Sequence, residues 1–263
     1  MLNFLYNTVL GRCLLKIATS KKIATIYAKY MNSSLSKHKI NRFIKKNNID
    51  MSEYEETNYN SFNDFFKRKI KKEKRKIEDG LIAICDAKLS AYKIHNNSSF
   101  EIKNSIYTVE ELTREKNNNY EYALIFRLGV ENYHHHIFPD NGKIIKSKKI
   151  DGILHTVQPI AFKKYKVFTE NTRNITYLDC KKLGNVCYIE VGAMLIGKIV
   201  NEDVKNFKKG SEKGHFEFGG STIVLLLEKN KVKIKKEILE NTKNNIETQV
   251  KLGENIGKLY NEK

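Results

Sequence analysis

Apolar residues recur every three or four positions along the first twenty residues, at Leu2, Leu5, Val9, Cys13 and Ile17. This spacing predicts an amphipathic helix. Arg12 and Lys16 interrupt the apolar run, so such a helix would lie on a bilayer rather than cross it. A signal peptide would have charges before the apolar stretch and a small-residue cleavage site after it, and neither is clear here. A helix that packs against the protein core is the alternative.

The helical and polar pattern continues from Ala24 to Asn60 and is followed by an aromatic and basic segment. Phe62, Phe65 and Phe66 form an aromatic face, and Lys67 to Lys76 holds eight basic residues and one acidic residue. Aromatic rings beside cations suit phospholipid headgroups or nucleic-acid phosphates. A solvated helix face is the simpler alternative.

The pattern changes after Gly80 to short runs rich in Ile, Val, Tyr and Phe, which Gly and Asn-Gly interrupt. These runs fall at 81–94, 122–130, 143–157, 186–200, 215–229 and 231–239. They are typical of β-strands. The sequence therefore predicts an α+β protein with two parts: a helical, basic region at 1–76, and a mostly antiparallel, β-rich domain at 77–263.

Charge and composition narrow the classes of protein further. The 263 residues include 48 Lys and Arg against 30 Asp and Glu, a net charge of +18, which points to an anionic partner. No apolar run reaches the roughly 18 to 20 residues that a membrane-spanning helix needs. The four cysteines show no C-x-x-C spacing, which argues against a disulfide scaffold or a zinc ribbon and suits a reducing compartment.

Three polar features stand out as candidates for chemistry. Asp86 follows an apolar strand, His134, His135 and His136 precede an Asn-Gly turn, and Ser221 follows two glycines at the start of a strongly apolar strand. Each has a simpler explanation: a turn residue, surface histidines, or a glycine bulge. Adjacent residues of a strand point to opposite faces, so three consecutive histidines do not ligate one ion, and we predict no metal site.

The three features together suggest activation of a hydroxyl group. A histidine that takes the serine proton and an aspartate that fixes the histidine tautomer are the residue types required. Gly220 leaves its own carbonyl carbon unshielded and allows a strained backbone. This arrangement would suit attack by Ser221 on the peptide bond that precedes it, although the spacing alone does not establish the reaction.

The sequence resembles the phosphatidylserine decarboxylase proenzymes over nearly its whole length. The matching blocks, in the family's order, are FNDFFKRKIK, CDAKLSAY, NYHHHIFPDNGKI, GILHTVQPIA, ENTRN, VGAMLIGKIV and KGHFEFGGSTIVLL. The resemblance implies self-cleavage between Gly220 and Ser221 into a β chain, 1–220, and an α chain, 221–263. Ser221 would become a covalent pyruvoyl group that forms a Schiff base with the lipid's serine amine, so no dissociable cofactor is needed.

The resemblance also implies a charge-relay aspartate, which matches Asp86, although Ala87 replaces the family's usual glycine. The family's histidine motif is Y-H-x-x-H followed by an apolar residue and Pro, and here Ile137 occupies the second histidine position. We therefore assign the base to His134 and keep His136 in reserve. Two further histidines are candidates for binding substrate, namely His155 and His215.

The partners that the resemblance implies are phosphatidylserine and an anionic phospholipid membrane, with the protein peripheral on the cytoplasmic face. On this basis the region 1–76 associates with the membrane, where we expect Phe62, Phe65 and Phe66 to insert, and the domain 77–263 is catalytic. Each basic side chain near such a surface contributes about 1 kcal/mol of attraction. Two other functions stay open at this point: a pyruvoyl-dependent decarboxylase of a soluble amino acid, and a nucleic-acid-binding module that uses its lysines and aromatic rings. The oligomeric state is also open, a homodimer included.

Overall fold

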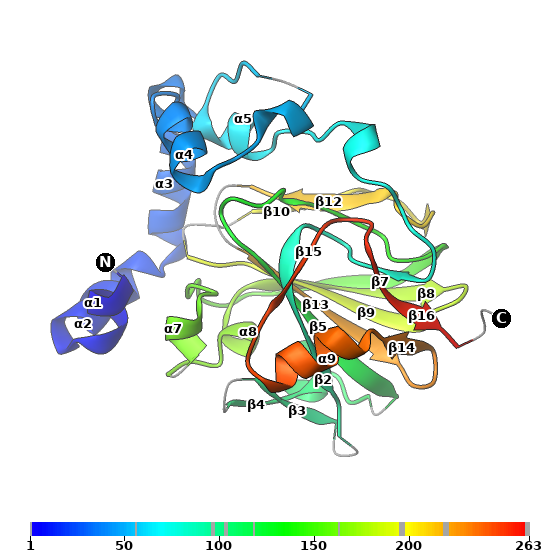
Figure 1. Ribbon diagram of the computed structural model, residues 1–263. Coiled ribbons are helices and arrows are strands. Elements are labelled where there is room, and N and C mark those ends of the chain that lie inside the picture. The colour runs from blue at the N-terminus through cyan, green and yellow to red at the C-terminus, as the bar shows by residue number, and fades with distance from the viewer. Residues whose placement is uncertain are drawn as a thin grey trace.

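The computed structural model describes residues 2–55, 57–95, 98–102, 105–117, 119–162, 164–194, 198–217 and 221–260. Helices make up the first part of the chain, and antiparallel sheets make up most of the rest (Figure 1). The predicted α+β fold with an N-terminal helical part is thus confirmed. In Figure 1 the N-terminal helices, coloured blue to cyan, lie to one side of the sheets and over one end of them.

Side-chain caps fix the starts of several helices. The Thr8 and Ser20 side chains accept hydrogen bonds from backbone N–H groups of the helices that follow them, and Ser61 does the same further along the chain. The helices of the N-terminal part are α1 (Leu2–Asn7), α2 (Val9–Ala18), α3 (Lys21–Asn32), α4 (Lys39–Asn47) and α5 (Phe62–Phe66), with short 3₁₀ turns at Ser34–Ser36, Met51–Glu53 and Lys72–Lys74. In the described part of the chain, the helices among the strands are α6 (Val109–Thr113), α7 (Pro159–Phe162), α8 (Val167–Glu170) and α9 (Lys236–Lys243).

A large antiparallel sheet of eight strands forms the centre of the molecule. In spatial order it consists of β11 (Asn206–Phe207), β7 (Gly142–Ile150), β8 (Arg173–Cys180), β9 (Gly184–Val191), β13 (Ser221–Glu228), β5 (Tyr120–Leu128), β2 (Ala87–Lys93) and β15 (Thr248–Val250). β13 is buried along nearly its whole length between β9 and β5. Its run of Ile, Val and Leu suits a central strand that has both faces covered.

Three small antiparallel sheets pack around the large one. One consists of β1 (Leu81–Ile82), β16 (Asn255–Leu259) and β14 (Val232–Ile234). Another consists of β10 (Ile199–Asn201), β12 (Glu212–Phe216) and β6 (His135–Ile137). The last is the hairpin of β3 (Ser99–Ile102) and β4 (Ser105–Thr108). The two faces of the large sheet bury separate apolar clusters. The first includes residues of β1, β6, β12, β14 and β16, and the second includes residues of α1, α2, α6, α7 and α8.

The aromatic residues of α5 are not available to a membrane, contrary to our expectation. Phe62, Phe65 and Phe66 are at most 2% exposed and form a third apolar cluster with residues of α3 and α4. Leu5 is also buried, against the large sheet. The spacing of apolar residues cannot distinguish a face that meets lipid from one that meets another helix. Among the described residues, no helix is long and apolar enough to cross a membrane.

Candidate active site

Ser221 is the first residue of β13 and lies opposite Leu128 of β5. It is fully buried, and its Oγ has no hydrogen-bond partner among the residues that the structure describes. Side chains alternate along a strand, so Ser221 shares the face of Ile223, which belongs to the first apolar cluster. A buried hydroxyl without a partner is costly and marks a candidate reactive group. The predicted junction partner, Gly220, lies outside the described residues.

The topology brings His134 to the same end of β13. The ladder between β5 and β13 ends at Ser221. Residues 129–134 then lead from β5 to β6, and residues 217–220 lead from β12 to β13. β6 and β12 also pair with each other, and the Phe216 amide donates a hydrogen bond to the His134 carbonyl at 3.1 Å. His134 is therefore held beside the last residue of β12, five residues before Ser221 along the chain.

The His134 ring is held in a defined tautomer. Its Nδ1 lies 2.8 Å from the Asn132 carbonyl oxygen, which only accepts hydrogen bonds, so Nδ1 carries the proton. In the neutral ring Nε2 is then the basic nitrogen. The ring is fully buried, and the Phe66 ring lies against it with centroids 4.1 Å apart. His134 thus has the tautomer that a general base requires.

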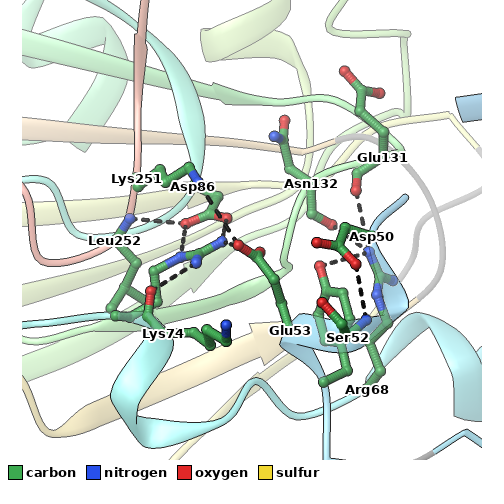
Figure 2. Close-up of polar contacts among 12 residues, drawn as sticks. Asp50, Ser52, Glu53, Arg68, Lys74, Asp86, Glu131, Asn132, Lys251 and Leu252 are labelled. Carbon is green, nitrogen blue, oxygen red and sulfur yellow. Dashed lines mark hydrogen bonds and ion pairs between the residues drawn. The ribbon is translucent and has the colours of Figure 1, made fainter. Parts of the chain in front are cut away.

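A buried arginine fixes the loop that carries His134. Arg68 is 2% exposed, and its Nη2 donates to the carbonyls of Glu131 and Asn132 at 3.1 and 3.3 Å (Figure 2). The same guanidinium lies over the rings of Tyr54 and Phe65. Sequence analysis missed this role, because Arg68 stands in a run of lysines that is typical of a solvated surface.

His136, the reserve base, lies in a buried polar cluster. Its Nδ1 is 3.0 Å from the Tyr188 hydroxyl, and its Nε2 is 4.0 Å from Glu190 Oε1. Glu190 forms a buried ion pair with Lys213. Burial, and then the charge of Lys213, hold the pKa of His136 well below its ordinary value. Because Glu190 pairs with Ile223, this cluster is on the same sheet face as Ser221.

His135 and His215 form a second cluster with Glu212, on the opposite side of the β6–β12 pair from His136. The β12 register shifts between Glu212 and Gly214, and this bulge brings Glu212 to the same side as His215. His135 Nδ1 lies 2.7 Å from the Glu212 carboxylate, and its Nε2 lies 3.0 Å from the Lys67 carbonyl. The sequence did not indicate this cluster, because it depends on the bulge.

The contacts of this cluster favour an ion pair over a metal site. One ligand atom from each of His135, Glu212 and His215 lies within 4.8 Å of the others. The two rings stack 4.9 Å apart at 26°, however, so their in-plane lone pairs run side by side rather than towards one point. Both nitrogens of His135 already face protein groups, namely the Glu212 carboxylate and the Lys67 carbonyl. Burial would raise the pKa of Glu212, but the His135 hydrogen bond and charge lower it.

Asp86 does not contact a histidine within the described residues. Its carboxylate accepts hydrogen bonds from Arg75 Nε at 3.0 Å and Nη2 at 2.6 Å, and from the Leu252 amide at 2.8 Å (Figure 2). The Asp86 charge nevertheless affects the pKa of Tyr133, the residue before His134. Burial raises the pKa of Tyr133, and the charges of Glu212 and Asp86 add to the rise.

The structure places His155 away from these groups. Its Nδ1 lies 3.2 Å from the Tyr6 hydroxyl of α1, and its ring stacks on Tyr165 at 4.0 Å. Both tyrosines belong to the second apolar cluster, on the sheet face opposite Ser221. Burial lowers the pKa of His155 to about 4. The candidates therefore separate into His134, His136, His215 and Ser221 around β12 and β13, Asp86 beside Arg75, and His155 beside α1.

Comparison with known proteins gives one consistent result. A family model described as phosphatidylserine decarboxylase matches residues 62–258. "Phosphatidylserine decarboxylase proenzyme 2" of Clostridium acetobutylicum is 49% identical over 264 residues, which cover 97% of this chain and 91% of that protein. The phosphatidylserine decarboxylase proenzyme of Fusobacterium nucleatum is 40% identical over 97% of this chain and 90% of that protein. The proenzyme of Clostridium tetani is also 40% identical, over 99% of this chain and 92% of that protein.

Proposed function

The chain belongs to the phosphatidylserine decarboxylase family, and on that premise we propose that it cleaves itself between Gly220 and Ser221. It is a carboxy-lyase that is made as a proenzyme and depends on a pyruvoyl group. That group supplies a carbonyl electron sink for the electron pair released when carbon dioxide leaves the serine headgroup. Family membership decides against the soluble amino-acid decarboxylase and the nucleic-acid-binding module that the sequence left open.

The observation that carries the cleavage site is the environment of Ser221. Its Oγ is buried without a hydrogen-bond partner among the described residues, at the start of the central strand. The Thr222 hydroxyl also lacks a partner among these residues, but of the two it is Ser221 that shares a face of β13 with the cluster of His136 and Glu190. This orphaned hydroxyl fits the residue from which the pyruvoyl group is made.

We assign proton transfer from Ser221 to His134. The His134 Nδ1 donates to the Asn132 carbonyl, so the His134 Nε2 is the nitrogen that accepts the serine proton. We keep Asp86 as the relay carboxylate, which Arg75 and the Leu252 amide hold in place. His136 stays in reserve, and within the core its Nδ1 contacts the Tyr188 hydroxyl.

The cleavage needs only groups of this chain and water. Ser221 Oγ attacks the Gly220 carbonyl carbon, the peptide C–N bond breaks, and the freed amine takes up a proton, so that an ester replaces the amide. Loss of the Ser221 α-proton then breaks the Cβ–O bond and releases Gly220 as a carboxylate. The dehydroalanine at position 221 tautomerises to an imine, and water releases ammonia to leave the pyruvoyl group.

The strand order supports an α chain that stays bound after the cut. The proposed α chain, 221–263, contributes β13, which pairs with β5 and β9 of the β chain. β15 pairs with β2, and β16 pairs with β1, so four ladders join the two chains. The buried apolar area along β13 adds to this association.

For the membrane, we propose peripheral docking through α2 on the cytoplasmic face. The enzyme acts on a membrane lipid, and α2 has an outward apolar face made of Val9, Leu10, Leu14 and Ile17, which are 45–73% exposed. Arg12 and Lys16 lie on the same helix, where they suit anionic headgroups. This face replaces Phe62, Phe65 and Phe66 in the docking hypothesis.

The experiment that tests the cleavage site compares the wild-type protein with Ser221→Ala on a denaturing gel. We expect the wild type to give two chains and Ser221→Ala to give one full-length chain. Ser211→Ala removes an exposed serine ten residues upstream and should cleave normally. A Ser221→Ala protein that still splits at this position would disprove the assignment.

A further inference from the structure

Asp86 is a buried carboxylate with a dedicated cation. Both Asp86 and Arg75 are at most 9% exposed, and the guanidinium holds the carboxylate through two nitrogens, Nε on one oxygen and Nη2 on the other (Figure 2). A bidentate arginine fixes both the position and the orientation of a carboxylate, which the point charge of a lysine does not. The third hydrogen bond, from the Leu252 amide, comes from the proposed α chain.

Arg75 is itself held in place on its other sides. Its Nη2 also contacts Glu53 at 3.1 Å, and its Nη1 donates to the Lys74 carbonyl at 2.9 Å. Hydrogen bonds and charge from Asp86 and Glu53 outweigh burial and raise the pKa of Arg75 above its ordinary value. The guanidinium is therefore a fixed part of this site rather than a mobile surface cation.

The surroundings of Asp86 provide no other close cation in the described part of the chain. The titratable and charged groups around the pair are Glu53, Tyr54, Lys74, Cys85, Tyr133 and Lys251. Of the two lysines, Lys251 pairs with Glu53 at 3.8 Å, and Lys74 contributes its backbone carbonyl to Arg75. An ionised carboxylate in such a place is strongly destabilised without its partner.

We propose that Arg75 is a positioning residue for self-cleavage, which holds the Asp86 carboxylate in place and oriented for its relay role. This inference rests on the proposed function, because it requires Asp86 to act in cleavage. It also changes the interpretation of the basic run Lys67–Lys76, since Arg68 and Arg75 are both buried there. Each of these arginines fixes a segment of the site, whereas exposed lysines of the run face solvent.

The test follows cleavage of newly made full-length chain in a cell-free translation, with the loss of precursor measured on denaturing gels. We expect Arg75→Gln to slow cleavage by roughly tenfold to a hundredfold, because the relay carboxylate loses its fixed position. Arg75→Lys should fall between Arg75→Gln and the wild type. Lys72→Gln is the control, because it removes an equal charge from the same basic run at a lysine that has no role in the site. We expect it to cleave at the wild-type rate.

Chemical rescue separates positioning from a merely structural role. Added guanidinium should speed the cleavage of Arg75→Ala, but not that of the double variant Arg75→Ala, Asp86→Asn, because the cation acts only through the carboxylate. Wild-type rates in Arg75→Gln, or rescue that does not depend on Asp86, would overturn the inference. If Arg75→Gln does not fold, Arg75→Lys decides: slowed cleavage supports the inference, and a wild-type rate overturns it.

Asp86→Asn alone distinguishes the two levels of the hypothesis. Normal cleavage in Asp86→Asn would refute the relay role itself, and with it the premise of this inference. Strongly slowed cleavage in Asp86→Asn together with normal cleavage in Arg75→Gln would keep the relay and refute the role of Arg75. Slowed cleavage in both, with rescue confined to proteins that retain Asp86, is the result we expect.

Discussion

The helices α2 and α5 both combine apolar side chains with nearby basic residues, but they have opposite surroundings. α5 buries Phe62, Phe65 and Phe66 against α3 and α4, and Phe66 contacts the ring of His134. α2 buries Leu15 on one side and leaves its other apolar residues exposed. Similar composition thus gives one segment that packs against the candidate base His134 and one whose apolar side chains are exposed. Tertiary contacts, rather than local sequence, decide between the two roles.

The strongest way to break this comparison is Phe66→Ala. Removing a fully buried aromatic side chain should lower the free energy of unfolding by about 3–5 kcal/mol. Cleavage should also slow, because the His134 ring loses its neighbour. Urea unfolding in the uncleaved Ser221→Ala background measures the first effect, and gels of the otherwise wild-type chain measure the second.

Phe43→Ala is the matched control, since Phe43 packs on Phe62 and Phe65 in the same cluster, and no contact between it and His134 is seen in the described residues. It should lose stability and keep cleavage. Equal cleavage rates in Phe43→Ala and Phe66→Ala would mean that α5 supports the fold and not the site.

A smaller effect concerns the inner side of the α1–α2 pair, which Tyr6 joins to His155. Burial lowers the pKa of His155 to about 4, against about 6.5 when unfolded, so the folded state binds fewer protons between these values. The contribution of His155 to the free energy of unfolding is therefore complete above pH 6.5. It decreases by up to about 3 kcal/mol as the pH falls towards 4.

Urea titrations of the Ser221→Ala proenzyme at several pH values measure this loss. His155→Gln, which cannot titrate in this range, should give a flatter dependence of stability on pH. His38→Gln removes an exposed histidine and should leave the dependence unchanged. An unaltered slope in His155→Gln would show that α1 docking does not depend on this group.

The smallest expected effect concerns the outer face of α2. Leu10→Ser should weaken binding to anionic vesicles by roughly tenfold, because about 1.5 kcal/mol or more of apolar burial is lost. Stability and cleavage should not change, since Leu10 is 65% exposed. Sedimentation with vesicles that contain phosphatidylglycerol measures binding. Ile145→Ser makes a comparable change on β7 and should bind normally. Equal binding by both variants would remove α2 from the docking hypothesis.

The sequence was sufficient for the fold class, because strand-like runs such as 122–130 and 215–229 contain the central strands β5 and β13. Family motifs were sufficient for the activity. The membrane role of Phe62, Phe65 and Phe66 was wrong, because an amphipathic pattern does not reveal what covers the apolar face.

The polar contacts of the site were less accessible from sequence. Arg75 and Asp86 are eleven residues apart, and nothing in their spacing indicates that they pair. Glu212 joins His135 and His215 only because β12 has a bulge, and bulges depend on three-dimensional register. The tautomer of His134 depends on the Asn132 carbonyl, which no side-chain pattern reports.

The most direct test of the account is the intact mass of the small chain from purified, active protein. We expect a chain of residues 221–263 that is lighter by one ammonia than the same peptide with an N-terminal serine, and that reacts with phenylhydrazine through its carbonyl. A small chain that begins with an unmodified serine, or a single uncut chain in fully active protein, would contradict the account.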